Sequence, residues 1–179
     1  AGGKWSTFII WAKHTFTMGH ADYQRQFEPI LYGWREGATR HWCGARDQGD
    51  VWNINKPHKN DLHPTMKPVE LMERAIRNSS RPGDVVLDPF GGSGTTMIAA
   101  EKSDRHARLM ELDPKYVDVI VRRWQDFSGG QATRQSDGVA FAAASGPGES
   151  RVEVAAADVG DVGHVRELAR LVGDSHAAD

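Results

Sequence analysis

The chain has 179 residues, of which 39% are hydrophobic and 26% charged, and its formal net charge is −2. These values are typical of one soluble globular domain. No apolar run approaches the roughly 20 residues of a membrane span, so we predict no membrane partner. The single cysteine, Cys43, excludes an internal disulfide framework and predicts a reducing, cytoplasmic compartment.

Charged and aromatic residues divide the chain near residue 128. Residues 128–179 hold four Arg, no Lys and eight Asp or Glu, a net charge of −4, against +2 for residues 1–127. All six Trp lie in the front part. We therefore interpret residues 128–179 as a linker and low-complexity tail. The front part is only mildly basic, so its bulk charge does not identify a nucleic-acid partner.

The front part alternates strand and helix patterns. Runs rich in β-branched and aromatic residues predict strands at 6–14 and 27–34, whereas residues 39–63 are irregular. The remaining patterns predict a helix at 67–80, a strand at 84–90, a helix at 94–104, a strand at 106–112 and a helix at 113–127. Strand–helix–strand–helix order predicts an α/β fold whose parallel sheet is covered on both faces.

A glycine-rich loop, "VVLDPFGGSGTT" at 85–96, joins the strand at 84–90 to the next helix. A phosphate-binding P-loop is excluded, because no lysine follows Gly91 until Lys102. A dinucleotide fingerprint is weakened, because Met97 stands where its third glycine belongs. A bare tight turn is the plainest alternative.

S-adenosylmethionine fits the same loop. Backbone N–H groups and the following helix N-terminus favour the carboxylate of its methionine end, and Asp88 can meet the ammonium. Glu111 ends the next strand, roughly 20 residues past the loop, where an acid for ribose hydroxyls is expected. Upstream, "HPTMKPVEL" at 63–71 carries two prolines, which stiffen the segment so that it can serve as a wall of the ligand site.

Three stretches in this order, 63–68, 87–96 and 110–116, resemble the motifs of the DNA amino-methyltransferases of the N-4/N-6 methylase family. The motif order is similar to that of the permuted β group, and residues 122–132 resemble prophage-type members. The resemblance covers roughly residues 5–140. It implies an incomplete S-adenosylmethionine-dependent methyltransferase fold, which is Rossmann-like with a mixed sheet and circularly permuted motif order.

The resemblance divides the chain into four parts. These are the end of the catalytic half at 1–38, a possible DNA-recognition segment at 39–62, the cofactor-binding half at 63–127 and the tail at 128–179. Basic residues of the recognition segment would track DNA phosphates; they are Arg40, Arg46, Lys56 and Lys59.

Site residues are implied by the same motifs. Those expected to bind the cofactor are His63, Thr65, Lys67, Pro68, Asp88, Phe90, Gly91, Gly92, Ser93, Gly94, Thr95, Thr96 and Glu111. Tyr23, Phe27 and Glu28 would lie near the target base, although many relatives have His where Phe27 stands, which a phenyl ring cannot replace as a donor. We predict no metal site. Arg122 and Arg123 could contact DNA phosphate, but we interpret them as part of a solvated helix face.

The family's chemistry needs an acid or amide followed by Pro-Pro and an aromatic residue, which hold the amino group of a flipped base. No Pro-Pro pair occurs in this chain, so it is expected to hold no catalytic residue. In the permuted group this motif lies in a preceding half, without which the strands at 6–14 and 27–34 would not connect to the later pair. The chain alone should bind cofactor weakly, if at all, and should not methylate.

The predicted function is therefore that of a fragment of a site-specific DNA methyltransferase, acting on adenine N6 or cytosine N4 in double-stranded DNA. Adenine is preferred, from the prophage-type resemblance, which also implies a prokaryotic or phage origin. Two alternatives stay open. One is a catalytically silent nucleic-acid-binding module, and the other is a dinucleotide-dependent oxidoreductase.

Overall fold

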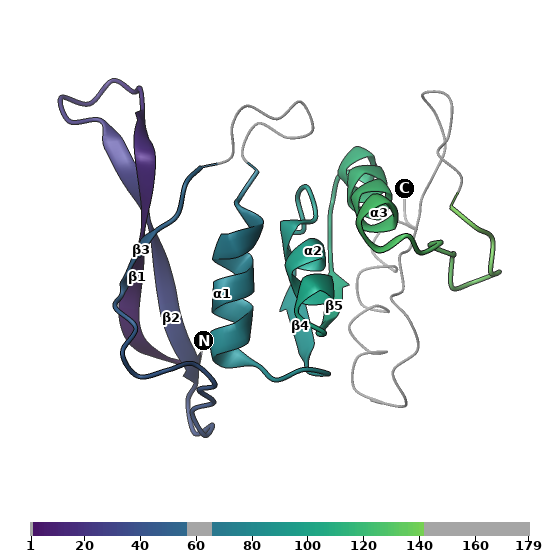
Figure 1. Cartoon of the computed structure of the whole chain (residues 1–179), viewed down its shortest axis with the longest axis horizontal. Coiled ribbons are helices and arrows are strands. Elements are labelled where there is room, and N and C mark those ends of the chain that lie inside the picture. Colours follow the sequence, from purple (N-terminus) through teal and green to yellow (C-terminus); the bar gives the residue numbers. More distant parts are fainter. Residues whose placement is uncertain (1, 57–65, 142–179) are drawn as a thin grey trace, which may run out of the picture.

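The structure, a computed structural model, describes residues 2–56 and 66–141 (Figure 1). Its strands are β1 (Gly3–Thr17), β2 (Arg25–Arg35), β3 (Val51–Asn53), β4 (Val85–Asp88) and β5 (His106–Leu109). Its helices are α1 (Val69–Ser79), α2 (Thr95–Lys102) and α3 (Pro114–Ser128). The predicted helices and the four predicted strands are therefore present, with bounds shifted by a few residues.

Strands β1 and β2 form a long antiparallel hairpin. Its buried side carries Trp11, which is 2% exposed and donates its indole N–H to the carbonyl oxygen of Ile54 over 2.7 Å. Trp52, Ile54 and Leu71 complete this core cluster. The hairpin is therefore fixed to the start of α1 by aromatic and aliphatic packing.

The segment at 39–62 is not wholly irregular, contrary to the prediction. Val51–Asn53 forms β3, which pairs in parallel with β1 through Ile10, Trp11 and Ala12. The sheet order is β2-β1-β3. Burial of Trp52 against Trp11 explains the pairing, because it places an aromatic side chain of a very short strand in the core.

Strands β4 and β5 pair in parallel, as the strand–helix–strand pattern predicted. One face packs on α1 and α2 through a cluster that includes Ile76, Ala99, Ala100 and Ala107. The prediction of cover on both faces is wrong for β4. Val85 and Leu87 are 51% and 67% exposed, because both helices pack on the face that holds Val86.

Within the described residues no ladder joins the β2-β1-β3 sheet to the β4-β5 sheet, as expected. Helix α1 lies between them (Figure 1). It packs on α2 at one side and, through Leu71 and Met72, on the hairpin core at the other. The two halves are thus held together by α1 instead of by a continuous sheet.

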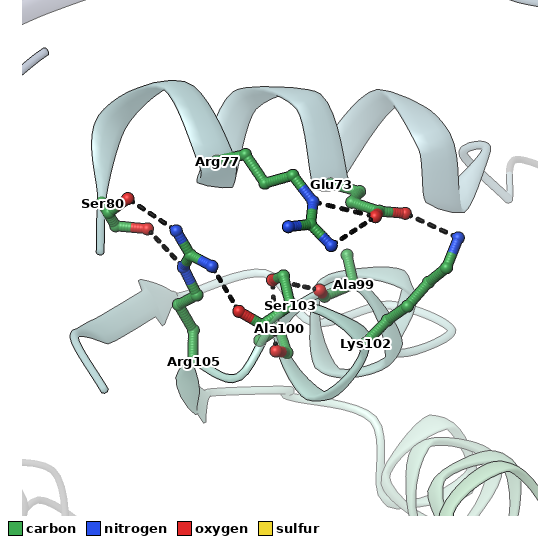
Figure 2. A network of polar contacts seen from close by, with 8 residues as sticks. All are labelled: Glu73, Arg77, Ser80, Ala99, Ala100, Lys102, Ser103 and Arg105. Atoms are coloured by element: carbon green, nitrogen blue, oxygen red, sulfur yellow. Dashed lines mark hydrogen bonds and ion pairs between the residues drawn. The ribbon is translucent and has the colours of Figure 1, made fainter. Parts of the chain in front are cut away.

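The C-terminal ends of α1 and α2 are locked by polar contacts (Figure 2). Buried Arg105 donates to the carbonyl oxygen of Ser80 over 2.7 Å, to its hydroxyl and to the carbonyl of Ser103. Nearby, Glu73 of α1 forms ion pairs with Arg77 and with Lys102 of α2. This network fixes how the two helices pack on one face of β4 and β5.

The predicted tail is only partly described. Residues 129–141 form a short turn, with an Arg134–Asp137 ion pair and a bridge between Thr133 and Ala140, so they are not a featureless linker. Residues 142–179 lie outside the described residues. Among the helices described, none is long and apolar enough to cross a membrane.

Candidate cofactor site

The glycine loop follows the end of β4 and opens α2. Gly92 and Gly94 have φ angles of 54° and 79°, in the left-handed region that favours glycine. Gly94 is also the N-cap of α2, and a Cβ added there would lie 3.1 Å from Ile120 of α3. The loop sequence therefore follows from backbone conformation and from close packing of α3.

Asp88 anchors the start of the loop. One carboxylate oxygen accepts from the Thr96 hydroxyl over 2.6 Å, and the other accepts from the backbone N–H of Phe90 over 3.0 Å. A carboxylate can accept further hydrogen bonds, so Asp88 keeps the capacity to meet an ammonium group. Its position at the carboxyl end of a parallel strand is a usual one for ligand contact.

Glu111 meets the loop from the end of β5. Its carboxylate accepts from the backbone N–H of Gly92 over 2.6 Å and from that of Asp113 over 3.0 Å. The Gly91 N–H also donates to the carbonyl oxygen of Met110 over 2.8 Å. The loop and the acid that the sequence paired are thus brought into direct contact.

Two apolar residues adjoin this contact in the sequence, Phe90 before Gly91 and Leu112 after Glu111. Phe90 is 86% exposed and Leu112 is 98% exposed. Such exposure is unusual for large apolar residues, and beside polar groups that converge on one point it is typical of a ligand site. Leu112 was not among the predicted site residues, although its position directly after the predicted ribose acid was a usable signal.

The wall segment is described only from Met66 onward, so His63 and Thr65 lie outside the described residues. The carbonyl oxygen of Lys67 accepts from the hydroxyl of Thr95 over 3.2 Å, and Pro68 is the N-cap of α1. The predicted wall therefore touches the first residue after the glycine loop. Thr95, Thr96 and Ser93 are all buried.

The hairpin contributes the residues predicted near the target base. Tyr23 is 93% exposed and Phe27 is 47% exposed. Glu28 forms 2.6 Å ion pairs with Lys13 and with Lys67. Burial alone would raise the pKa of Glu28, but hydrogen bonds and charge from the two lysines outweigh it and hold this pKa below its usual value.

Arg123 is a site residue that the sequence interpretation missed. It does not belong to a solvated face: it is half-buried and donates to the carbonyl oxygen and hydroxyl of Ser93 in the glycine loop. Burial lowers the pKa of its guanidinium from the usual value. Arg122, which pairs with Asp118 at 3.8 Å, is the exposed neighbour that the interpretation described correctly.

A pocket of about 370 Å³ lies elsewhere, at the C-terminal end of α1. Ala75, Asn78 and Ser79 line it, whereas the glycine loop lies near the helix's opposite end, at Lys67 and Pro68. Arg40 and Arg46 also line this pocket, and Arg40 lies over the rings of Trp34 and Trp42. Two cations of the possible recognition segment are therefore distant from the glycine loop.

The described residues hold no group of three His, Cys, Asp or Glu side chains placed to bind a metal ion. The polar groups that converge at the loop are carboxylates, backbone N–H groups and hydroxyls. This donor set suits a ligand with an ammonium, a carboxylate and a ribose.

Comparison with known proteins identifies the family. The model of the N6/N4 DNA methylase family matches residues 2–122, which is more than half of the chain. The chain belongs to this DNA methylase family.

The individual proteins that resemble this chain agree with the family match. The type II methyltransferase M.Cfr9I of Citrobacter freundii is 43% identical over 99 residues, covering 55% of this chain and 33% of that protein. The M1.HpyAVI–SAM complex has a TM-score of 0.59 at 30% identity, covering 68% of this chain and 63% of that one.

A putative DNA modification methylase from Thermus thermophilus, TTHA0409, solved with S-adenosyl-L-methionine, has a TM-score of 0.57 at 32% identity. The shared region covers 72% of this chain and 56% of that one. These likenesses confirm the predicted methyltransferase fold. The chain spans about a third of the length of the curated relatives it matches.

Proposed function

We propose that this chain is the cofactor-binding part of a DNA amino-methyltransferase that uses S-adenosylmethionine. One observation carries the proposal: the 2.6 Å hydrogen bond from Gly92 to Glu111 joins the loop and the acid at the ends of two parallel strands. The solved complexes of M1.HpyAVI and TTHA0409 with this cofactor support it.

The residues suit each part of the cofactor. Backbone N–H groups at the start of α2 would hold the carboxylate, and Asp88 the ammonium. Glu111 would take the ribose hydroxyls, beside the exposed side chains of Phe90 and Leu112, which offer apolar surface to a flat purine. Lys67 and Pro68, with His63 and Thr65, would close the methionine side.

The cofactor, when bound, supplies an electrophilic methyl group on a sulfonium. That methyl group would pass to the exocyclic amine of the base, which would lose a proton, and the cofactor would leave as S-adenosylhomocysteine. The role of this chain would be to hold the methyl donor at a constant position relative to the hairpin. There, Tyr23 and Phe27 would face the flipped base.

The group that holds the amine would come from a further segment of the enzyme. Three observations support this proposal. The chain has no Pro-Pro pair, spans about a third of its curated relatives, and keeps its two described sheets unjoined. A segment that pairs with the free edges of β2 and β4 would remove two exposed strand edges. We place the assembled enzyme in the cytoplasm, on double-stranded DNA.

The dinucleotide alternative is disfavoured by packing. Met97 is partly buried against the cluster of Ala99, Ala100 and Ala107, where a dinucleotide fingerprint has a glycine for close helix–strand contact. A silent nucleic-acid-binding module would share every contact described above. Only methyl transfer to DNA distinguishes such a module from an enzyme.

The test is methyl transfer by the enzyme that contains this chain within its complete reading frame. Purified enzyme, DNA and cofactor with a labelled methyl group are incubated, and the DNA is digested to nucleosides. We expect label in N6-methyladenine, with loss of activity in Glu111→Ala. Label in N4-methylcytosine would change the base assignment, whereas DNA binding without any labelled base would favour the silent module.

A further inference from the structure

A continuous path of polar contacts links the hairpin to the glycine loop. It runs from Lys13 on β1 to Glu28 on β2, then to Lys67 before α1 and to Thr95 at the start of α2. The path therefore crosses between the two sheets that no ladder joins among the described residues.

Lys13 is the fixed end of this path. Its side chain is 7% exposed, and its ammonium lies 2.6 Å from a carboxylate oxygen of Glu28. A buried ammonium is strongly unfavourable without a partner, so Lys13 holds Glu28 in place. The carbonyl oxygen of Lys13 also accepts from the side chain of Gln26 over 3.0 Å, which ties β1 to β2 at the same level.

Trp11 supports both lysines. The ammonium groups of Lys13 and Lys67 lie 5.0 and 5.5 Å from its ring centroid. Two cations share one carboxylate here, so one positive charge is left over, and the electron-rich face of a buried indole stabilises it. Trp11 thus defines where the Glu28 bridge can form.

The other oxygen of Glu28 lies 2.6 Å from Lys67, whose side chain is 38% exposed and forms its one ion pair among the described residues here. The backbone of Lys67 in turn accepts from Thr95, and the Thr95 hydroxyl lies 3.5 Å from that of Ser93. The position of Lys67 therefore directly affects the positions of the end of the glycine loop and of the first turn of α2.

We propose that Glu28 is a positioning residue. It fixes Lys67, and through Lys67 and Thr95 it fixes the glycine loop relative to the hairpin beside the target base. This inference rests on the proposed function only in taking the loop as the cofactor loop. Both carboxylate oxygens of Glu28 are committed to lysines, so its main contribution is made through Lys67 and not by contact with the base.

The test is amide hydrogen exchange on the enzyme that contains this chain, with no cofactor added. Two reporter amides lie in the loop and first turn: Gly94 N–H donates to Gly91, and Ile98 N–H donates to Gly94. Reference amides at the other end of α2 are those of Arg105 and His106. We expect Glu28→Gln to speed exchange of the reporters by about tenfold while the reference amides change less than twofold.

Two variants at Lys67 keep the test informative if Glu28→Gln fails to fold. Lys67→Met should reproduce the effect, because it removes the ammonium that Glu28 holds. Lys67→Arg should keep the exchange rates close to those of the parent protein, because a guanidinium can make the same ion pair.

Glu73→Gln is the matched control. Glu73 also bridges two cations, but they lie in the last turns of the helices, Arg77 in α1 and Lys102 in α2, so its loss should leave Gly94 and Ile98 unchanged. Equal acceleration of all four amides in Glu28→Gln, or none at the reporters, would overturn the proposal. Amide exchange needs no bound ligand. Its outcome is therefore independent of S-adenosylhomocysteine binding, and it is the binding measurement that tests the proposed function.

Discussion

Arg123 on α3 reaches the glycine loop and places its guanidinium 3.1 Å from the hydroxyl oxygen of Ser93, while also donating to the Ser93 carbonyl. The Ser93 carbonyl precedes the N-cap residue Gly94, so this contact holds the loop at the point where it turns into α2. A helix that follows β5 therefore stabilises the ligand loop that follows β4.

Replacing Arg123 should loosen the loop. We expect Arg123→Met to lower the free energy of unfolding by about 1–2 kcal/mol, because it removes a charged donor from a partly buried carbonyl. Affinity for S-adenosylhomocysteine in the assembled enzyme should fall about tenfold. Urea unfolding and calorimetric titration measure the two quantities. Arg122→Met is the control and should stay within about 0.5 kcal/mol of the parent. Equal effects of both variants would contradict the role given to Arg123.

Gly92 and Gly94 should differ in their tolerance of a side chain. Both have positive φ, which costs roughly 1–2 kcal/mol for alanine. At Gly94 a Cβ would also lie 3.1 Å from Ile120, whereas at Gly92 the nearest atom is 3.9 Å away. Gly94→Ala should therefore destabilise the chain more than Gly92→Ala in thermal unfolding. The Ile120 atoms in question are Cγ1, Cγ2 and Cα, so Ile120→Val, which keeps all three, should leave the difference between the two variants unchanged, whereas Ile120→Ala, which removes Cγ1 and Cγ2, should reduce it.

Arg105 should contribute more to stability than any exposed cation of the same network. Its buried guanidinium satisfies the carbonyls of Ser80 and Ser103, so Arg105→Met should lower the free energy of unfolding by about 2–4 kcal/mol. Lys102→Met, which removes only an exposed partner of Glu73, should cost less than about 1 kcal/mol. Similar urea midpoints for the two variants would show that Arg105 is not the structural lock that the geometry indicates.

Acid should weaken the fold through two carboxylates. The lysines that outweigh burial lower the pKa of Glu28, and the hydrogen bond from Lys102 is the main cause of the lowered pKa of Glu73. A folded-state pKa below the usual 4.5 means that this stability is complete above 4.5 and is lost as the pH falls through the folded value. Unfolding midpoints between about pH 6 and pH 3 should fall less steeply for Glu28→Gln and Glu73→Gln than for the parent.

Glu70→Gln is the control for that experiment. Glu70 lies on α1 with Glu73 but takes part in none of the ion pairs formed among the described residues. Glu70→Gln, which removes a carboxylate outside both bridges, should flatten the curve less than Glu28→Gln or Glu73→Gln does. If the curve flattened equally in all three variants, general charge reduction, and not the two bridged carboxylates, would cause the loss of stability at low pH.

The contact between Gly92 and Glu111 could be predicted from sequence because the carboxyl ends of neighbouring parallel strands meet at one edge of a sheet. The role of Arg123 could not. Two adjacent arginines on a helix point about 100° apart, and the sequence alone does not say which of them faces a neighbouring loop. Packing of Ile120 beneath Gly94 decides the matter in favour of Arg123.

Strand β3 and the Glu28 bridge escaped prediction for different reasons. Three residues are too few to show an alternating pattern, so Val51–Asn53 was indistinguishable from loop. Glu28 and Lys67 are 39 residues apart, and their pairing depends on how the hairpin packs on α1 through Trp11 and Leu71. Both features arise from tertiary packing, to which local patterns give no access.

Calorimetric titration of S-adenosylhomocysteine into the enzyme that contains this chain, in parallel with NAD, decides whether the glycine loop and Glu111 bind S-adenosylmethionine. We predict saturable binding of S-adenosylhomocysteine that Glu111→Ala reduces by at least about tenfold and Arg46→Ala leaves intact, with no binding of NAD. Binding of NAD in its place, or binding of S-adenosylhomocysteine that is indifferent to Glu111→Ala, would contradict the claim.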